Sequence, residues 1–212
     1  MERHSQQLMH FHTPPATADA AAQVALLVVH GRNQDPAFMQ QQVVQRLEWS
    51  HLPAVYPAAV DKTWYPAGFM APVAENAGYL EDALLTLDKA LAFMGEQGYP
   101  PHRVLLIGFS QGACLLSEYV RTRPQRYHGL VAFTGGYVGP AEFVAAPHGQ
   151  LHGMPVYVST AENDAWVPAV RTRATANLFE AMGAAVLCDI FEDRPHEVSE
   201  AELKRVQGMF GF

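Results

Sequence analysis

A serine lies between two glycines in the segment Gly108-Phe109-Ser110-Gln111-Gly112. This G-x-S-x-G spacing is typical of a sharp turn from a strand into a helix, where the serine hydroxyl is exposed and a side chain at either glycine would collide with its neighbours. Six serines and 16 glycines in 212 residues would produce about 0.03 such segments by composition alone. Ser110 is therefore predicted to be a nucleophile, and the alternative is a glycine-rich turn with an incidental serine.

Asp164 and His196 lie on loops that follow later strand-like segments, in the order acid and then base after Ser110. A serine hydroxyl becomes a good nucleophile when a neutral imidazole accepts its proton and a carboxylate orients that imidazole. This chain order is expected for a serine on a strand-to-helix turn. Asp164 is predicted to be the acid and His196 the base, with Glu162 and Asp193 as alternative acids. Other histidines are expected to be surface or packing residues: His102, His128, His148 and His152.

The first strongly apolar run ends in His30-Gly31-Arg32-Asn33. A serine nucleophile that attacks a carbonyl needs two N–H donors for the developing oxyanion, one after the serine and one from a loop after an early strand. The amides of Gln111 and Arg32 are predicted to be these donors, with Asn33 as the second choice for the loop. His30 is expected to order the loop by hydrogen bonding. The Arg32 side chain is expected to be solvated, and contact with a substrate carboxylate is the alternative.

Large apolar side chains lie on two loops near these residues. These side chains are Trp64, Tyr65, Phe69, Met70 and Trp166. They are predicted to line an apolar acyl pocket, and packing of the loops onto the sheet is an equal alternative. Cys114, one helical turn beyond Ser110, is expected to be a small core residue and not a nucleophile.

Strand-like and helix-like segments alternate along the chain, which predicts an α/β fold with a mostly parallel open sheet and helices on both faces. Six strands are expected, at residues 24–29, 54–56, 103–107, 130–133, 155–160 and 185–191. Five helices are expected, one beginning at Asp35-Pro36 and the others at 80–94, 111–122, 168–182 and 199–209. Ser199 and Glu202 form a capping box for the last helix, and residues 57–76 are expected to be a long ordered loop. The span 135–153 is too short for a large cap domain.

The composition indicates a single globular domain over residues 1–212, with a polar leader at 1–22. Hydrophobic residues make up 49% of the chain, and the formal charge is -7, which argues against nucleic acid or an anionic membrane as a partner. No apolar stretch approaches the ~20 residues of a membrane helix. The absence of a signal-peptide pattern and the presence of only two cysteines lead us to expect a cytoplasmic protein. His4, His10 and His12 have no cysteine or carboxylate cluster beside them, so no metal site is expected.

Five segments together resemble the phospholipase/carboxylesterase family of the α/β-hydrolase superfamily, which includes acyl-protein thioesterases and small bacterial carboxylesterases. They are the segments 27–32, 63–66, 108–112, 164–168 and 195–199. The resemblance implies a triad of Ser110, Asp164 and His196, an oxyanion hole made by the Arg32 and Gln111 amides, and neither metal nor cofactor. It is also compatible with a homodimer. The chain departs from the family at Asn33, Ala161 and Pro195, where many relatives have glycine.

The sequence thus predicts a carboxylesterase-type serine hydrolase, which cleaves small carboxylic esters with an apolar acyl or aryl group through an acyl-enzyme. A thioesterase or lysophospholipase with the same triad is an alternative, as is a non-catalytic ligand-binding module with the hydrolase fold. The natural substrate, the acyl-chain length and the oligomeric state are left open.

Overall fold

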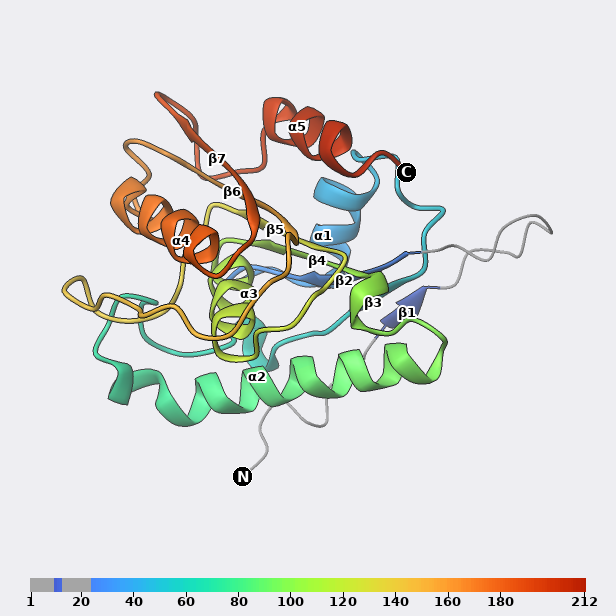
Figure 1. The fold of residues 1–212 in the computed structure, drawn as a ribbon, viewed down its shortest axis with the longest axis horizontal. Coiled ribbons are helices and arrows are strands. Elements are labelled where there is room, and N and C mark those ends of the chain that lie inside the picture. The colour runs from blue at the N-terminus through green and yellow to red at the C-terminus, as the bar shows by residue number, and fades with distance from the viewer. Residues whose placement is uncertain (1–9, 13–23) are drawn as a thin grey trace.

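The computed structural model describes residues 10–12 and 24–212, so most of the predicted leader, including His4, lies outside the described residues. The described chain forms a sheet of seven strands in the order β1-β3-β2-β4-β5-β6-β7 (Figure 1). The parallel strands are β2 (Ala25–Val29), β3 (Ala54–Tyr56), β4 (Val104–Phe109), β5 (Gly129–Phe133), β6 (Pro155–Ala161) and β7 (Ala185–Phe191). The predicted fold class is confirmed. The short edge strand β1 (His10–His12), antiparallel to β3, was not predicted.

The central strands are apolar throughout because both faces of the sheet are covered. In β2, Ala25, Leu27 and Val29 face one hydrophobic cluster, whereas Leu26 and Val28 face the other. All five are at most 1% exposed. A strand buried on both faces loses the alternation of polar and apolar residues that a half-exposed strand shows.

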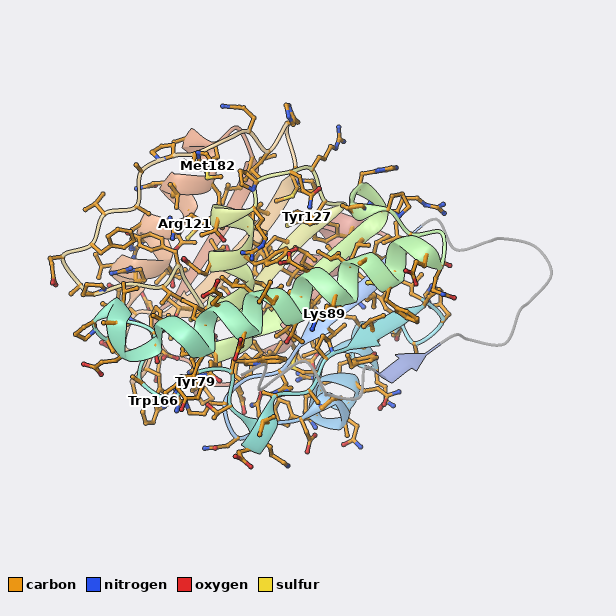
Figure 2. All side chains as sticks on the ribbon, turned by 90° about the horizontal axis from the view of Figure 1, so that it is seen from below. Tyr79, Lys89, Arg121, Tyr127, Trp166 and Met182 are labelled. Carbon is orange, nitrogen blue, oxygen red and sulfur yellow. The ribbon has the colours of Figure 1, made fainter. Side chains whose placement is uncertain are left out.

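Three helices cover one face and two helical segments cover the other (Figure 1). The first group is α2 (Val73–Glu96), α3 (Gln111–Thr122) and α4 (Ala169–Ala181). The second is α1 (Pro36–Met39), which continues as a π-helix over Gln40–Val44, and α5 (Glu200–Phe210). Figure 2 looks onto α2, which runs across the width of the first face. No helix in the described part of the chain is long and apolar enough to cross a membrane.

The helix starts follow from local capping chemistry. Asp35 accepts a hydrogen bond from Phe38 N at the start of α1, and Ser199 and Glu202 form the predicted capping box of α5. The start of α2 differs from the prediction, because the helix begins at Val73 and takes up the last four residues of the expected loop. The first turns of α2 are small, polar and mostly exposed, so they carry no apolar periodicity.

Candidate active site

Ser110 occupies the sharp turn between β4 and α3. Its φ of 53° and ψ of -120° lie in a region that L-residues rarely adopt, and its N–H donates to Phe133 O in β5 over 3.0 Å. A Cβ at Gly108 would come within 2.7 Å of the Gly112 backbone, and one at Gly112 within 2.2 Å of Val29 O. The two glycines therefore allow the turn to pack against β2 and α3, as the motif predicts.

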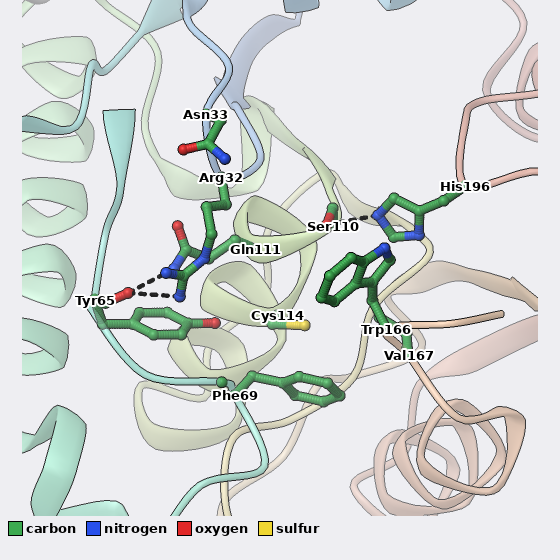
Figure 3. A pocket seen from close by; sticks show the side chains of 11 residues that line it. Arg32, Asn33, Tyr65, Phe69, Ser110, Gln111, Cys114, Trp166, Val167 and His196 are labelled. Carbon is green, nitrogen blue, oxygen red and sulfur yellow. Dashed lines mark hydrogen bonds between the residues drawn. The ribbon is translucent and has the colours of Figure 1, made fainter. Parts of the chain in front are cut away.

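Ser110, His196 and Asp164 form a continuous chain of hydrogen-bonding atoms. His196 Nε2 lies 2.9 Å from Ser110 Oγ, and His196 Nδ1 lies 2.9 Å from Asp164 Oδ2 (Figure 3 draws the first contact). An ionised carboxylate accepts hydrogen bonds only, so it selects the tautomer with the proton on Nδ1 and leaves Nε2 as an acceptor for the serine hydroxyl. The three residues come together from the ends of β4, β6 and β7.

The Asp164 carboxylate is fixed by backbone donors. Burial alone would raise the pKa of Asp164, whose side chain is 0% exposed. Hydrogen bonds from His196 and from the N–H groups of Trp166 and Val167, the latter two at 2.9 and 2.8 Å, outweigh burial and hold the pKa below its ordinary value. Asp164 is therefore a carboxylate at neutral pH. The alternative acids are placed elsewhere, since Glu162 pairs with Arg173 at the surface and Asp193 is exposed.

A buried arginine holds the loop that carries His196. Arg194 Nη1 donates to the carbonyls of Pro195 and Glu197, which flank His196 in the chain. Arg194 Nη2 donates to Thr134 Oγ1 over 2.7 Å and lies 3.6 Å from a carboxylate oxygen of Glu202.

Glu202 ties this arginine to the rest of the fold. Its carboxylate accepts the Ser159 hydroxyl of β6 over 2.6 Å and caps α5 through Ser199. The side chains of Arg194 and Glu202 are 4% and 0% exposed. No pattern in the sequence marks Arg194 as a site residue, because an arginine in a loop is usually solvated.

The loop after β2 leaves one backbone donor available. Gly31 N donates to the Gln34 side chain, Asn33 N to Lys62 O and Gln34 N back to Gly31 O. Arg32 N makes no hydrogen bond to the described residues, whereas Asn33 N is already occupied by Lys62 O. The φ of Asn33 is 61°, a left-handed conformation in which asparagine is a common substitute for glycine. Across the pocket, Gln111 N is the first N–H of α3 and has no partner within that helix.

His30 orders this loop, as predicted. Its Nε2 accepts from Ala59 N over 3.0 Å, and its Nδ1 lies 2.7 Å from Gly31 O, which it reaches as a donor. Burial lowers the pKa of His30 in spite of the bond to Gly31. His30 is thus a neutral, structural histidine.

The Arg32 side chain neither is freely solvated nor faces the pocket as a ligand for a carboxylate. Its guanidinium donates to three successive carbonyls, those of Tyr65, Pro66 and Ala67, over 2.7–2.8 Å. Arg32 is exposed, as the sequence predicts, but the prediction did not include its bonds to the carbonyls of an irregular loop. The Gln111 side chain acts on the same loop: its Nε2 donates to Tyr65 O and its Oε1 accepts from Trp64 N.

A cavity of about 310 Å³ opens beside Ser110. Its lining includes three of the predicted pocket residues, Tyr65, Phe69 and Trp166, of which Trp166 is 72% exposed (Figure 3). Trp64 and Met70 are not lining residues. Trp64 is 0% exposed and donates its indole N–H to His30 O, so it packs the loop onto the sheet, which was the alternative.

The lining also includes the residues predicted to act as nucleophile, base and oxyanion donors, namely Ser110, His196, Arg32, Asn33 and Gln111. Gly68, Cys114 and Val167 complete the lining and were not predicted to belong to the site. Cys114 is 1% exposed, and burial raises the pKa of its thiol to about 12, so the thiol is protonated. His102, His148 and His152 are exposed, and His128 packs against Phe210 and Phe212. The described residues contain no group of three or more metal-ligating side chains that could hold an ion.

The sheet, the strained serine turn and the adjoining histidine and aspartate define an α/β-hydrolase. The phospholipase/carboxylesterase family matches residues 49–210. A phospholipase/carboxylesterase from Dyadobacter fermentans DSM 18053 is 32% identical, with a TM-score of 0.87 over 99% of this chain and 98% of that chain. The chain therefore belongs to the phospholipase/carboxylesterase family of hydrolases, which confirms the resemblance.

Two other solved structures share the fold at lower identity. The Bacillus cereus carboxylesterase is 15% identical, with a TM-score of 0.76 over 97% of this chain and 94% of that chain. Esterase PE8 is 20% identical, with a TM-score of 0.75 over 96% of this chain and 97% of that chain. No curated protein matches the chain.

Proposed function

We propose that the protein is a serine hydrolase that cleaves small carboxylic esters through an acyl-enzyme. The observation that carries this proposal is the chain of contacts from Ser110 Oγ through His196 to Asp164, each 2.9 Å long. That geometry lets the imidazole accept the serine proton while the buried carboxylate stabilises the resulting cation.

In the proposed acylation, Ser110 Oγ attacks the ester carbonyl carbon as its proton passes to His196 Nε2. The N–H groups of Arg32 and Gln111 donate to the oxyanion. When the tetrahedral intermediate collapses, the alcohol leaves with the proton from His196, and Ser110 carries the acyl group. Water then attacks the acyl-enzyme with His196 as base, which releases the acid and restores the serine hydroxyl.

The pocket favours a substrate of modest size with an apolar acyl or aryl group. Phe69 and the exposed Trp166 form apolar walls beside Ser110, and a cavity of about 310 Å³ suits a short chain. A thioester or a lysophospholipid would use the same chemistry. Single-domain organisation, a homodimer and a cytoplasmic location stay predictions from the sequence.

The experiment compares Ser110→Ala with wild type on short p-nitrophenyl esters. We expect kcat/KM to fall by at least about 10⁴-fold, because neither the acyl-enzyme nor the proton relay can form. Ser117→Ala is the matched control, since Ser117 is a buried serine of the same helix whose hydroxyl bonds only Ala113 O. A fluorophosphonate probe should label wild type and Ser117→Ala but not Ser110→Ala. Turnover by Ser110→Ala at the wild-type rate would overturn the proposal.

A further inference from the structure

Among the described residues, no oxygen or nitrogen atom forms a hydrogen bond with the buried hydroxyl of Tyr65. The Cys114 thiol interacts with this hydroxyl, but a thiol is a weak hydrogen-bonding group and leaves it poorly satisfied. Tyr65 lines the pocket although it is only 1% exposed, and its hydroxyl points toward Cys114 and the cavity (Figure 3). In the described chain, only one other buried side-chain atom lacks a partner, Arg194 Nε, and Arg194 does not line the pocket. Buried polar groups are nearly always satisfied in folded proteins, so an unpaired hydroxyl at a binding site points to a ligand atom.

The backbone that carries this ring is held firmly. Tyr65 O accepts from Gln111 Nε2 and from Arg32 Nη2, both over 2.8 Å, and Trp64 N donates to Gln111 Oε1. Since Gln111 follows the serine directly, the same contacts set the ring's position relative to the reacting atoms. The hydroxyl is thus presented to the pocket by a preorganised element.

The two charged side chains that act on the hydroxyl are engaged elsewhere, since Arg32 binds loop carbonyls and Glu118 pairs with Arg121. Cys114 follows Ser110 by four residues, which separates their backbone positions by about 6 Å along the helix axis. Burial raises the pKa of Cys114 to about 12 and that of Tyr65 well above its ordinary value, so both groups keep their protons. Arg32 is the one Lys or Arg residue in the lining, and three carbonyls occupy its guanidinium. A carboxylate on the acyl chain would therefore lose water without gaining a free cation.

We infer that the preferred acyl chain carries a neutral acceptor oxygen, such as an ether, keto or hydroxyl oxygen, that receives a hydrogen bond from Tyr65. The inference rests on the proposed esterase function and names its substrate class. A plain alkyl chain leaves the buried hydroxyl unpaired, whereas an oxygen at the right depth satisfies it. The separation of Cys114 from Ser110 places this oxygen a few bonds beyond the ester carbonyl.

The test uses p-nitrophenyl esters in pairs that exchange one methylene for an ether oxygen. The pairs are methoxyacetate with butanoate, 3-methoxypropanoate with pentanoate, and 4-methoxybutanoate with hexanoate. For at least one pair, the ether-to-alkyl ratio of kcat/KM should be roughly tenfold higher in wild type than in Tyr65→Phe. Comparing this ratio between the two proteins cancels the inductive effect of the ether on the ester. Phe69→Leu is the matched control, because it alters an apolar wall and should leave the ratio as in wild type.

Thermal unfolding gives an independent readout. Tyr65→Phe should unfold at about the wild-type temperature or above it, because the change deletes a buried hydroxyl whose interaction in the free protein is with the weakly hydrogen-bonding Cys114 thiol. A lower temperature would indicate a structural partner for the hydroxyl and would count against the inference.

The inference and the proposed function fail in different ways. If esters are hydrolysed but the ratio is equal in wild type and Tyr65→Phe for all three pairs, the inference is overturned; a water molecule that satisfies the hydroxyl in every complex would give this result. If no ester is hydrolysed in a Ser110-dependent manner, the proposed function fails instead. Calorimetric binding of 4-methoxybutanamide and hexanamide then decides: a preference for the ether that Tyr65→Phe abolishes supports the inference, and an unchanged preference overturns it.

Discussion

Two arginines clamp the two halves of the site, and they do so in opposite environments. Arg194 donates to the carbonyls on either side of His196 from a position that is 4% exposed, with the buried carboxylate of Glu202 at 3.6 Å. Arg32 donates to three carbonyls of the loop that carries Tyr65, but it lies at the exposed rim of the pocket. Both arginines satisfy backbone groups that irregular loops leave unpaired.

The difference indicates which half of the site depends on one side chain, because several contacts of the His196 loop are made by Arg194. The loop of His196 is held by Arg194, which forms a buried charge pair with Glu202. Removal of either residue leaves the charge of the other uncompensated in a low-dielectric interior. The loops around Arg32 are also held by His30, by the Gln111 side chain and by the bond from Asn33 N to Lys62 O. Water can moreover reach Pro66, whose carbonyl Arg32 binds. We therefore expect one substitution in the loop of His196 to cause a large loss of stability and activity. A single substitution in the loops around Arg32 should cause a smaller loss of both.

The largest effect is expected for Arg194→Met. The change leaves the buried Glu202 carboxylate without its cationic partner and frees the carbonyls beside His196, so the free energy of unfolding should fall by about 3–5 kcal/mol. Urea unfolding measures this loss, and steady-state kinetics should show a decrease in kcat larger than any change in KM. The kinetic loss follows from misplacement of His196, which acts on bound substrate.

The double variant Arg194→Met/Glu202→Met separates stability from positioning. Removing both charges should restore part of the stability, because no buried charge is left unpaired. The recovery is incomplete because Glu202→Met also removes the acceptor of the Ser159 hydroxyl and the capping box of α5. The value of kcat should nevertheless stay low, since the carbonyls of Pro195 and Glu197 are still unclamped. A double variant with wild-type kcat would show that Arg194 stabilises the fold without positioning His196.

The sequence predicts features that depend on local patterns, and it does not predict features that depend on distant partners. The serine turn, the order of acid and base and the bounds of α3, β3 and β7 follow from local patterns, such as the paired glycines and continuous apolar runs. The roles of Arg194 and the Arg32 side chain depend on which distant carbonyls lack partners, and no local pattern encodes that. Trp64 and Tyr65 are adjacent aromatics, and their orientation depends on distant partners: Gln111 binds the backbone of both, and His30 O binds the Trp64 indole N–H.

The next largest effect is expected in the pH dependence of stability, to which His30 contributes in the loops around Arg32. The pKa of His30 is lowered by burial, so between this pKa and the ordinary value near 6.5 the unfolded chain binds a proton that the folded protein does not. The contribution of His30 is therefore complete above pH of about 6.5 and is lost as the pH falls through the folded pKa. One proton corresponds to a slope of at most ~1.4 kcal/mol per pH unit.

Urea unfolding of wild type and His30→Gln between pH 8 and 5 measures this slope. Wild type should lose stability more steeply than the variant as the pH falls. His128, whose pKa is also lowered by burial, contributes equally to both proteins and cancels. Asp164 contributes at lower pH, because its depressed pKa preserves stability until the carboxylate itself is protonated. Parallel slopes for the two proteins would mean that His30 is not the neutral group that holds this loop.

The smallest effect is expected for Arg32→Met, which is the direct counterpart of Arg194→Met. The Arg32 N–H is a backbone group and survives the change, and water can replace the guanidinium at the exposed carbonyls, so the free energy of unfolding should fall by only about 1 kcal/mol. The value of kcat should fall severalfold, because the loop that shapes the oxyanion site and seats Tyr65 becomes less ordered. Arg32→Lys should recover only part of the activity, since an ammonium group cannot match the fork that spans three carbonyls. A loss of stability as large as that of Arg194→Met would contradict the view that this half of the site is held by several independent contacts.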